Sequence, residues 1–247
     1  MSNSLIVKNL TVSLGQKKIL SEINLTVAAG KIVVLMGLNG SGKSTLAKAI
    51  SGHPDYQINR GQIIFNQKDF TKQPSWQRSR AGLFGSWQNP LEIAGLNFYQ
   101  FLLTIFSASC GHNQATLFEQ RLQQGLKNLK LKAEFLERDL NVGFSGGEKK
   151  KAEILQLYIL QPQIAVLDEI DSGLDIDALH LIAKNIKQLA KQGVGFLLIT
   201  HYARLLSYLK VKEVKVMISG KIVKSGGMAL VRQLEKQGYQ KISSQSK

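Results

Sequence analysis

The chain of 247 residues has a single cysteine, only four prolines and no long apolar run. The single cysteine, Cys110, excludes an internal disulfide and, without other ligands, a metal cluster. The most apolar stretch, residues 98–108, contains Gln100 and is much shorter than the roughly 20 residues that span a bilayer. We therefore expect no direct insertion into a membrane, and any role there would depend on a partner.

Acidic residues are also scarce, since 32 lysines and arginines face 17 aspartates and glutamates, a net charge of +15. Such an excess of positive charge is typical of proteins that bind nucleic acid or other polyanions. However, the basic residues are scattered, their only tight run is Lys149–Lys151, and aromatic residues do not interleave with them as a base-stacking surface requires. The sequence therefore does not favour nucleic acid as a partner.

The N-terminal segment, MSNSLIVKNL, lacks the basic start and apolar stretch of a targeting peptide. We therefore expect a cytoplasmic protein or one of the plastid stroma. The richness in lysine tilts this expectation toward a plastid-encoded chain.

Strand patterns occur at both ends of the chain. Residues 5–14 and 22–28 alternate apolar and polar side chains, as half-buried antiparallel strands do. Continuous apolar runs, typical of strands covered on both faces, lie at residues 31–36, 164–168 and 195–200. These patterns predict an α/β fold with a mixed sheet, in which a parallel core is flanked by antiparallel strands.

The middle of the chain differs from both ends. From about residue 92 to 160 apolar residues recur at three- and four-residue spacing, which predicts an all-helical insert. The remaining predicted elements are helices at residues 45–52 and 177–193, strands at 61–66 and about 82–87, and a hairpin of 214–219 and 221–226. A short polar tail at residues 243–247 is expected to be disordered.

A phosphate-binding loop is predicted at residues 37–44, GLNGSGKS, between a strand and a helix. Its glycines let backbone N–H groups point at a β-phosphate, and the following helix adds its positive end. Lys43 supplies a charge for the β- and γ-phosphates, and the Ser44 hydroxyl can ligate Mg²⁺. The predicted ATP-binding residues of the loop are Gly37, Asn39, Gly40, Ser41, Gly42, Lys43, Ser44 and Thr45.

A second acidic motif, IAVLDE, ends the apolar run at residues 164–168. Asp168 is delivered to the carboxyl end of its strand, where ligands gather in parallel sheets, and is predicted to hold Mg²⁺ mainly through water. Glu169 is predicted to orient and partly deprotonate the attacking water. An adjacent acidic pair of this kind can instead cap a helix at the surface, but its place beside a phosphate loop favours catalysis.

Four further motifs complete a pattern that resembles the ABC ATPase family: FSGGE at 144–148, SGLD at 172–175, Gln88 in SWQNP and His201 in ITHY. The resemblance implies a P-loop NTPase fold of ABC ATPase type in a single domain of residues 1–247. A RecA-like core and antiparallel strands would then occupy 1–91 and 161–247, and a helical subdomain about 92–160.

The same resemblance implies roles for these motifs. The signature residues Ser145, Gly146, Gly147 and Glu148 would serve the ATP of an opposite copy, so that hydrolysis needs a nucleotide-dependent homodimer. The D-loop would be Ser172, Gly173, Leu174 and Asp175. Gln88 would join Ser44 and Asp168 at the metal and also contact ATP. The implied catalytic residues are Lys43, Glu169 and His201.

One departure from the family concerns the adenine base. Many members place an aromatic residue near the end of the first strand, whereas this chain has Leu14 and no Tyr or Phe there. We predict modest ATP affinity and loose base selectivity, which a strong preference for ATP over GTP would contradict.

Longer segments resemble the SufC family, the ABC ATPases of the SUF system that assembles iron–sulfur clusters in bacteria and plastids. They are residues 47–56, 78–97, 144–156, 167–179 and 231–242. The resemblance implies that the chain works with the scaffold proteins SufB and SufD and powers a shape change in them. We expect the scaffold to dock on residues 89–101 and the early helical insert, because this stretch is unusually apolar.

Two alternatives and one regulatory hypothesis stay open. The same ATPase domain could serve as the ATPase subunit of a membrane transporter. The positive charge would suit a DNA-associated ABC ATPase, although such proteins usually carry long coiled coils and no sustained heptads occur here. Finally, Lys149–Lys151 could pair with Glu169 in an unpartnered copy and restrain it, or could simply form a solvated helix face.

Overall fold

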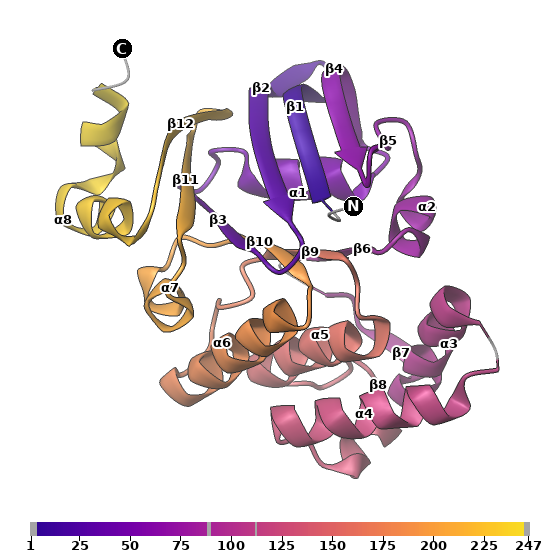
Figure 1. The fold of residues 1–247 in the computed structure, drawn as a ribbon. Helices are drawn as coiled ribbons and strands as arrows, with labels where there is room; N and C mark the ends of the chain where they lie inside the picture. The colour runs from indigo at the N-terminus through magenta and orange to yellow at the C-terminus, as the bar shows by residue number, and fades with distance from the viewer. Residues whose placement is uncertain (1–3, 88–89, 112, 245–247) are drawn as a thin grey trace.

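The computed structural model describes residues 4–87, 90–111 and 113–244. Six strands form a central sheet in the order β12-β11-β3-β10-β9-β6, all parallel except the edge strand β12 (Figure 1). Their bounds are β3 Ile32–Met36, β6 Leu83–Ser86, β9 Ile164–Asp168, β10 Gly195–Ile199, β11 Glu213–Ile218 and β12 Lys221–Gly226. The predicted parallel core and the terminal hairpin of β11 and β12 are confirmed.

A second, antiparallel sheet lies above the central sheet in Figure 1. Its order is β2-β1-β4-β5, formed by β1 Ser4–Leu14, β2 Lys17–Ala28, β4 Tyr56–Phe65 and β5 Lys68–Asp69. Helix α1 (Lys43–Ser51) contacts strands of both sheets and is closed by Gly52 in the left-handed conformation. The short helix α2 (Ser75–Arg80), which the sequence patterns did not predict, leads into β6.

The opposite side of the central sheet carries most of the helices (Figure 1). They are α3 Phe98–Cys110, α4 Ala115–Leu129, the 3₁₀ turn η1 Ala133–Glu137, α5 Gly146–Leu160, α6 Ile176–Lys191 and α7 Ala203–Leu209. A last helical segment, α8 (Met228–Ser244), packs on β11 and β12 and is broken at Gly238, where φ is 71°. The expectation of a disordered tail at residues 243–247 was wrong for Ser243 and Ser244, which end α8, and residues 245–247 lie outside the described residues.

The central sheet separates two hydrophobic clusters. Along β3, Val33 and Leu35 point into the cluster shared with the antiparallel sheet and α1, while Val34 and Met36 point into the helical cluster. This alternation follows from the two-residue period of a strand, and it explains why covered strands read as continuous apolar runs. Both clusters therefore fix the position of the loop that follows β3.

The prediction of an all-helical insert at about residues 92–160 was wrong. Two short strands, β7 (Ile93–Asn97) and β8 (Asp139–Leu140), pair there in antiparallel fashion. The pattern missed them because β8 has only two residues and β7 contains Gly95, with φ of 80° and an irregular register. Within the described residues, no helix has both the length and the apolar character needed to cross a membrane.

Candidate active site

The loop between β3 and α1 requires glycine at two of its positions. Gly42, the N-cap of α1, has φ of 107°, and a Cβ there would lie 2.6 Å from Leu20 Cδ2. At Gly37 a Cβ would collide with the Met217 carbonyl oxygen. The loop is therefore pressed against β2 and β11, and its backbone is positioned by contacts that only glycine permits.

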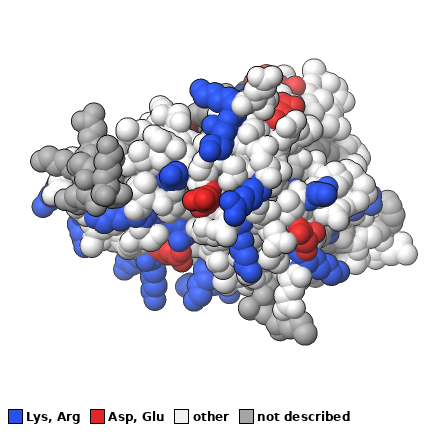
Figure 2. Space-filling view, turned by 90° about the horizontal axis from the view of Figure 1, so that it is seen from above, with Lys and Arg blue, Asp and Glu red and all other residues white. Residues whose placement is uncertain are grey.

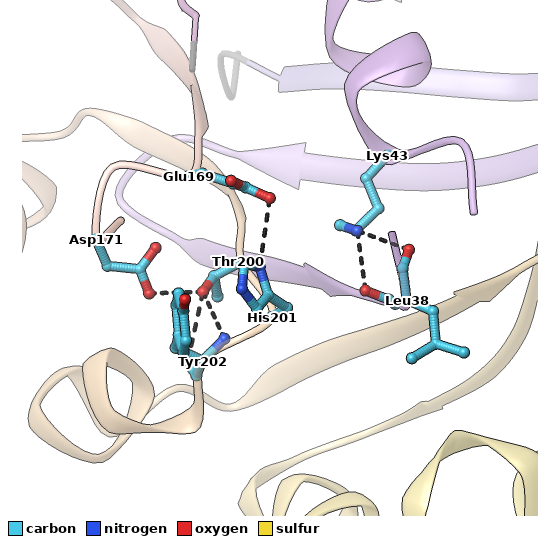
Figure 3. A network of polar contacts seen from close by, with 8 residues as sticks. Leu38, Lys43, Glu169, Asp171, Thr200, His201 and Tyr202 are labelled. Carbon is cyan, nitrogen blue, oxygen red and sulfur yellow. Dashed lines mark hydrogen bonds and ion pairs between the residues drawn. The ribbon is translucent and has the colours of Figure 1, made fainter. Parts of the chain in front are cut away.

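The Lys43 ammonium lies within this loop, since its Nζ donates hydrogen bonds to the carbonyl oxygens of Gly37 at 2.9 Å and Leu38 at 3.0 Å (Figure 3). The residue is only 5% exposed. Burial lowers the pKa of Lys43, and the carboxylates of Glu169 and Asp168 oppose that shift. A buried cation is thus held beside two acidic groups.

Asp168 is the last residue of β9 and points toward α1. Its neighbour Leu167 belongs to the helical cluster, so the alternation of the strand places Asp168 on the other face with Val166. The residue is 2% exposed, and its Oδ1 has no hydrogen-bond partner among the described residues. Burial raises the pKa of Asp168, and a hydrogen bond with the Ser44 hydroxyl partly offsets the shift.

An unsatisfied, buried carboxylate oxygen next to a serine hydroxyl suits a hard divalent cation. The described residues include no group of three or more His, Cys, Asp or Glu side chains that could hold a metal ion. A cation at Asp168 would therefore draw its other ligands from hydroxyl, water and phosphate oxygens, as Mg²⁺ usually does.

Glu169 follows β9 in a left-handed conformation with φ of 53°, and its N–H donates to the Ile199 carbonyl at 2.9 Å. Its Oε1 lies 3.3 Å from His201 Nδ1 (Figure 3). The contact does not meet the geometry of a hydrogen bond, and it is an ion pair when the imidazole is protonated. The strand ends of β9 and β10 thus bring the predicted base and the predicted histidine together.

A buried network holds the segment around His201. The Thr200 hydroxyl donates to Asp171 Oδ2 at 2.6 Å and accepts from the Tyr202 N–H at 2.9 Å (Figure 3). The rings of His201 and Tyr202 are in contact, with centroids 3.9 Å apart and planes tilted by 40°. Burial raises the pKa of Asp171, and the Thr200 hydrogen bond opposes that shift.

Lys43, Glu169 and His201 line a cavity of about 620 Å³, whereas the buried Asp168 is not among its lining residues. The phosphate loop lines it with Asn39, Gly40, Gly42, Lys43, Ser44 and Thr45. Other elements contribute Ile19, Glu169, Ser172, His201 and Tyr202. None of the signature residues at 145–148 is among the lining residues, so one copy of the chain encloses only part of the predicted site.

The signature segment begins α5 with a capping box. Ser145 Oγ accepts from the Glu148 N–H at 3.2 Å, and Glu148 Oε2 accepts from the Ser145 N–H at 2.8 Å. Ser145 and Gly146 are exposed, and a Cβ at Gly146 would meet no described heavy atom within 4 Å. The helix therefore presents an open N-terminus, which suits an anion supplied from outside the copy.

Comparisons with known proteins agree with this geometry. A family model described as "ABC transporter" matches residues 20–172. The chain is 45% identical over 251 residues to "Probable ATP-dependent transporter slr0075" of Synechocystis sp., covering 99% of this chain and 98% of the relative. It is 46% identical over 246 residues to "Probable ATP-dependent transporter ycf16" of Antithamnion sp., covering 97% and 98%. A solved "ATP binding subunit of ABC transporter" shares the fold, with a TM-score of 0.81, 24% identity and 98% of both chains covered.

The chain belongs to the ABC transporter ATPase family. As a member of that family it is a P-loop ATPase that binds and hydrolyses ATP. ABC ATPases dimerise and work with membrane or scaffold partners. The predicted fold class, an α/β P-loop fold with an antiparallel β subdomain and helical parts, is confirmed.

The predicted D-loop of this ABC ATPase lies beside the cavity only in part. Of the D-loop, Ser172 lines it, Gly173 and Leu174 line a neighbouring cavity of about 450 Å³, and Asp175 caps α6 by accepting from the Ala178 N–H at 2.7 Å. Gln88, the predicted ATP and metal ligand, lies outside the described residues.

Sequence patterns missed two residues of the site in this ABC ATPase. Ile19 of β2 lines the cavity, whereas Leu14, the position compared with the family's aromatic residue, does not. Tyr202 also lines it and is 47% exposed. The only available signal was their sequence position, since Ile19 lies within a strand and Tyr202 directly follows the predicted histidine.

The lysines after the signature contact other carboxylates. Lys149 Nζ lies 2.6 Å from Glu92 Oε1, and the buried Lys150 Nζ lies 3.5 Å from Glu153 Oε2. The Lys150 contact is Coulombic, because its geometry does not meet that of a hydrogen bond. The hypothesis that these lysines restrain Glu169 therefore stays a prediction, and the ion pairs observed for Lys149 and Lys150 involve other partners.

Proposed function

We propose that this ABC ATPase hydrolyses Mg²⁺–ATP between two copies of itself and drives a shape change in the SufB–SufD scaffold during iron–sulfur cluster assembly. The observation that carries the catalytic part is the separation of the two half-sites. The cavity of one copy contains the phosphate loop, while the exposed start of α5 carries the signature elsewhere.

In this proposal the loop residues 37–45 bind the phosphates through their backbone N–H groups. Lys43 leaves the Gly37 and Leu38 carbonyls and turns its ammonium toward the β- and γ-phosphates. Ser44 and Asp168, with Gln88, would hold Mg²⁺. When bound, that ion neutralises charge on the phosphate oxygens.

The chemical step falls to the strand ends of β9 and β10. Glu169 Oε1 accepts hydrogen bonding from the attacking water and orients it toward the γ-phosphate. His201 faces Glu169 through Nδ1 at 3.3 Å, which leaves Nε2 to contact the γ-phosphate. The Asp171–Thr200–Tyr202 network holds the His201 backbone in position for that contact.

The dimer supplies the remaining groups. Ser145 Oγ already accepts a hydrogen bond within the capping box, so its proton can be donated to a phosphate oxygen of the opposite copy. The N–H groups of Gly146 and Gly147 open α5 and add the positive end of the helix. The D-loop, Ser172–Asp175, would contact its counterpart across the interface.

The scaffold would dock on an apolar groove beside the helical part. This groove, of about 360 Å³, lies between α2, β6, α3 and α5, and its apolar lining includes Trp76, Phe84, Trp87, Phe101 and Ile105. Within the proposed docking stretch, Leu91 is 79% exposed and Ile93 is 41% exposed. In this proposal the exposed apolar side chains, together with the groove, form the surface that the scaffold covers.

Affinity purification of the tagged full-length chain from its native source tests the scaffold assignment. We expect SufB and SufD to co-elute, and Leu91→Glu to reduce their recovery severalfold because it places a charge in the proposed interface. Leu14→Glu, at an exposed leucine of the antiparallel sheet, should leave recovery unchanged. Recovery of the scaffold proteins with Leu91→Glu at the original level would contradict the docking surface.

The second candidate function is the ATPase subunit of a membrane transporter. The names of two relatives, both "Probable ATP-dependent transporter", favour it. The same purification separates the two candidates, since a transporter subunit should bring down membrane-spanning proteins in place of the scaffold.

A further inference from the structure

We propose that Arg138 is a positioning residue for hydrolysis, because its guanidinium braces the signature loop in the shape that receives the nucleotide of a second copy. This inference rests on the proposed function of the signature. Arg138 lies between η1 and β8, outside the motifs that the sequence analysis singled out.

The guanidinium reaches both sides of the signature loop. Its Nη2 donates to the Gly143 carbonyl oxygen at 2.6 Å, and its Nη1 donates to Glu148 Oε1 at 3.1 Å. Glu148 Oε2 in turn accepts from the Ser145 N–H at 2.8 Å. One planar group thereby fixes the residue before Phe144 and the carboxylate that caps the helix.

Aromatic rings pack against the guanidinium. Its central carbon lies 4.4 Å from the ring centroid of Phe144 and 5.6 Å from that of Phe135. These two rings are 4.5 Å apart and both contact the fully buried Phe98. Stacking of this kind restricts the arginine to one orientation, which a lysine ammonium would not reproduce.

The charges around the pair favour an ionised Glu148. The hydrogen bond from the Ser145 backbone, together with Arg138, holds the pKa of the Glu148 carboxyl below its usual value. The carboxylate form of Glu148, which accepts the hydrogen bond of the capping box, is therefore favoured. Loss of Arg138 would leave Glu148 and the Gly143 carbonyl without this common donor, and the loop could sample other shapes.

The side chains of Arg138 and Glu148 are each 35% exposed, so the pair adds little to global stability. Its effect should instead be seen where the second copy binds. Arg138 is not among the residues that line the phosphate-loop cavity, so nucleotide binding to a single copy should not depend on it.

The test uses ATP-dependent dimerisation of the full chain, measured by analytical ultracentrifugation in the Glu169→Gln background, which should stall hydrolysis. We expect Arg138→Ala in that background to raise the ATP concentration for half-dimerisation about tenfold or more, and Arg138→Lys to give an intermediate shift. The melting temperature and the binding of a fluorescent ATP analogue to single copies should stay unchanged. Arg60→Ala, at an exposed arginine of β4, serves as the matched control.

Each outcome decides the matter. Dimerisation of the Arg138→Ala double variant at the same ATP concentration as Glu169→Gln alone would overturn the role of Arg138 while leaving the split site intact. A weakened dimer in which single copies also lose nucleotide or melt earlier would show a merely structural role. Absence of any ATP-dependent dimer in Glu169→Gln itself would overturn both proposals.

Discussion

Lys149 Nζ and Glu92 Oε1, 57 residues apart in the chain, lie 2.6 Å from each other and join the first turn of α5 to the segment before β7. Just before the signature, the Asn141 side-chain amide makes a second tie to the same stretch by donating to the Leu91 carbonyl at 2.7 Å. The exposed stretch on which we expect a scaffold to dock is therefore attached directly to the signature segment. A partner that moves Leu91 would also pull on the start of α5.

The Lys149–Glu92 pair should matter for coupling and hardly for stability. Glu92 is half exposed, so breaking the pair should cost less than about 1 kcal/mol of unfolding free energy. We expect Glu92→Lys to leave basal ATP hydrolysis within about twofold, since it lies outside the cavity, but to reduce scaffold-stimulated hydrolysis severalfold. The charge-swapped double variant Glu92→Lys/Lys149→Glu should restore stimulation. If the swap restores nothing, the pair does not couple the two segments.

Replacing Glu169 with Gln should separate binding from hydrolysis. The amide keeps the size of the side chain but cannot accept a proton from water, so we expect the hydrolysis rate to fall by about 10² to 10⁴. Nucleotide binding should persist, because Lys43 and the glycine loop are untouched. Phosphate release and analogue binding, measured on the same preparation, check both halves of this expectation. A rate close to that of the parent chain would remove Glu169 from its assigned role.

Gly42→Ala should damage the phosphate loop through backbone strain and crowding together. A Cβ at φ of 107° would lie 2.6 Å from Leu20 Cδ2, for which we expect a loss of about 1–3 kcal/mol in stability and much weaker ATP binding. Gly15→Ala is the matched control, since Gly15 also has a positive φ, of 56°, but no described heavy atom lies within 4 Å of an added Cβ. Urea unfolding and nucleotide titration of both variants provide the measurement. Equal losses in the two variants would show that crowding at Leu20 plays no part.

Glu153 should make the protein less stable as the pH rises toward neutrality. Burial raises the pKa of Glu153 to about 7, with Lys150 opposing the shift, against 4.5 for an ordinary glutamate. Between these values the folded chain retains a proton that the unfolded chain has lost, so the unfolding free energy falls with rising pH. Glu153→Gln removes this contribution and should flatten the pH dependence of the unfolding free energy, measured by urea unfolding, by on the order of 1–3 kcal/mol. Glu119→Gln, at an exposed glutamate of α4, should leave the slope as it was.

The sequence predicted the parts of the fold and site that depend on neighbouring residues. A strand, a glycine loop and a helix are adjacent in the chain, and Asp168 follows its own apolar run, so local patterns suffice. The pairing of β7 with β8 joins segments about 40 residues apart and rests on two residues of one strand. Ile19 lines the cavity because of the way the antiparallel sheet packs over the central sheet. The spacing of apolar residues along one strand does not predict that packing. Arg138 was missed for a related reason, because its acceptors become neighbours only when the loop at 143–148 folds back.

The alternating side chains of β3 have a thermodynamic consequence. Since Val33 and Leu35 support one cluster while Val34 and Met36 support the other, neither cluster can melt without uncovering a face of the same sheet. The half that binds nucleotide and the helical half should then unfold together in one cooperative thermal transition. The part that binds nucleotide and the part proposed to contact the partner would then form a single thermodynamic unit.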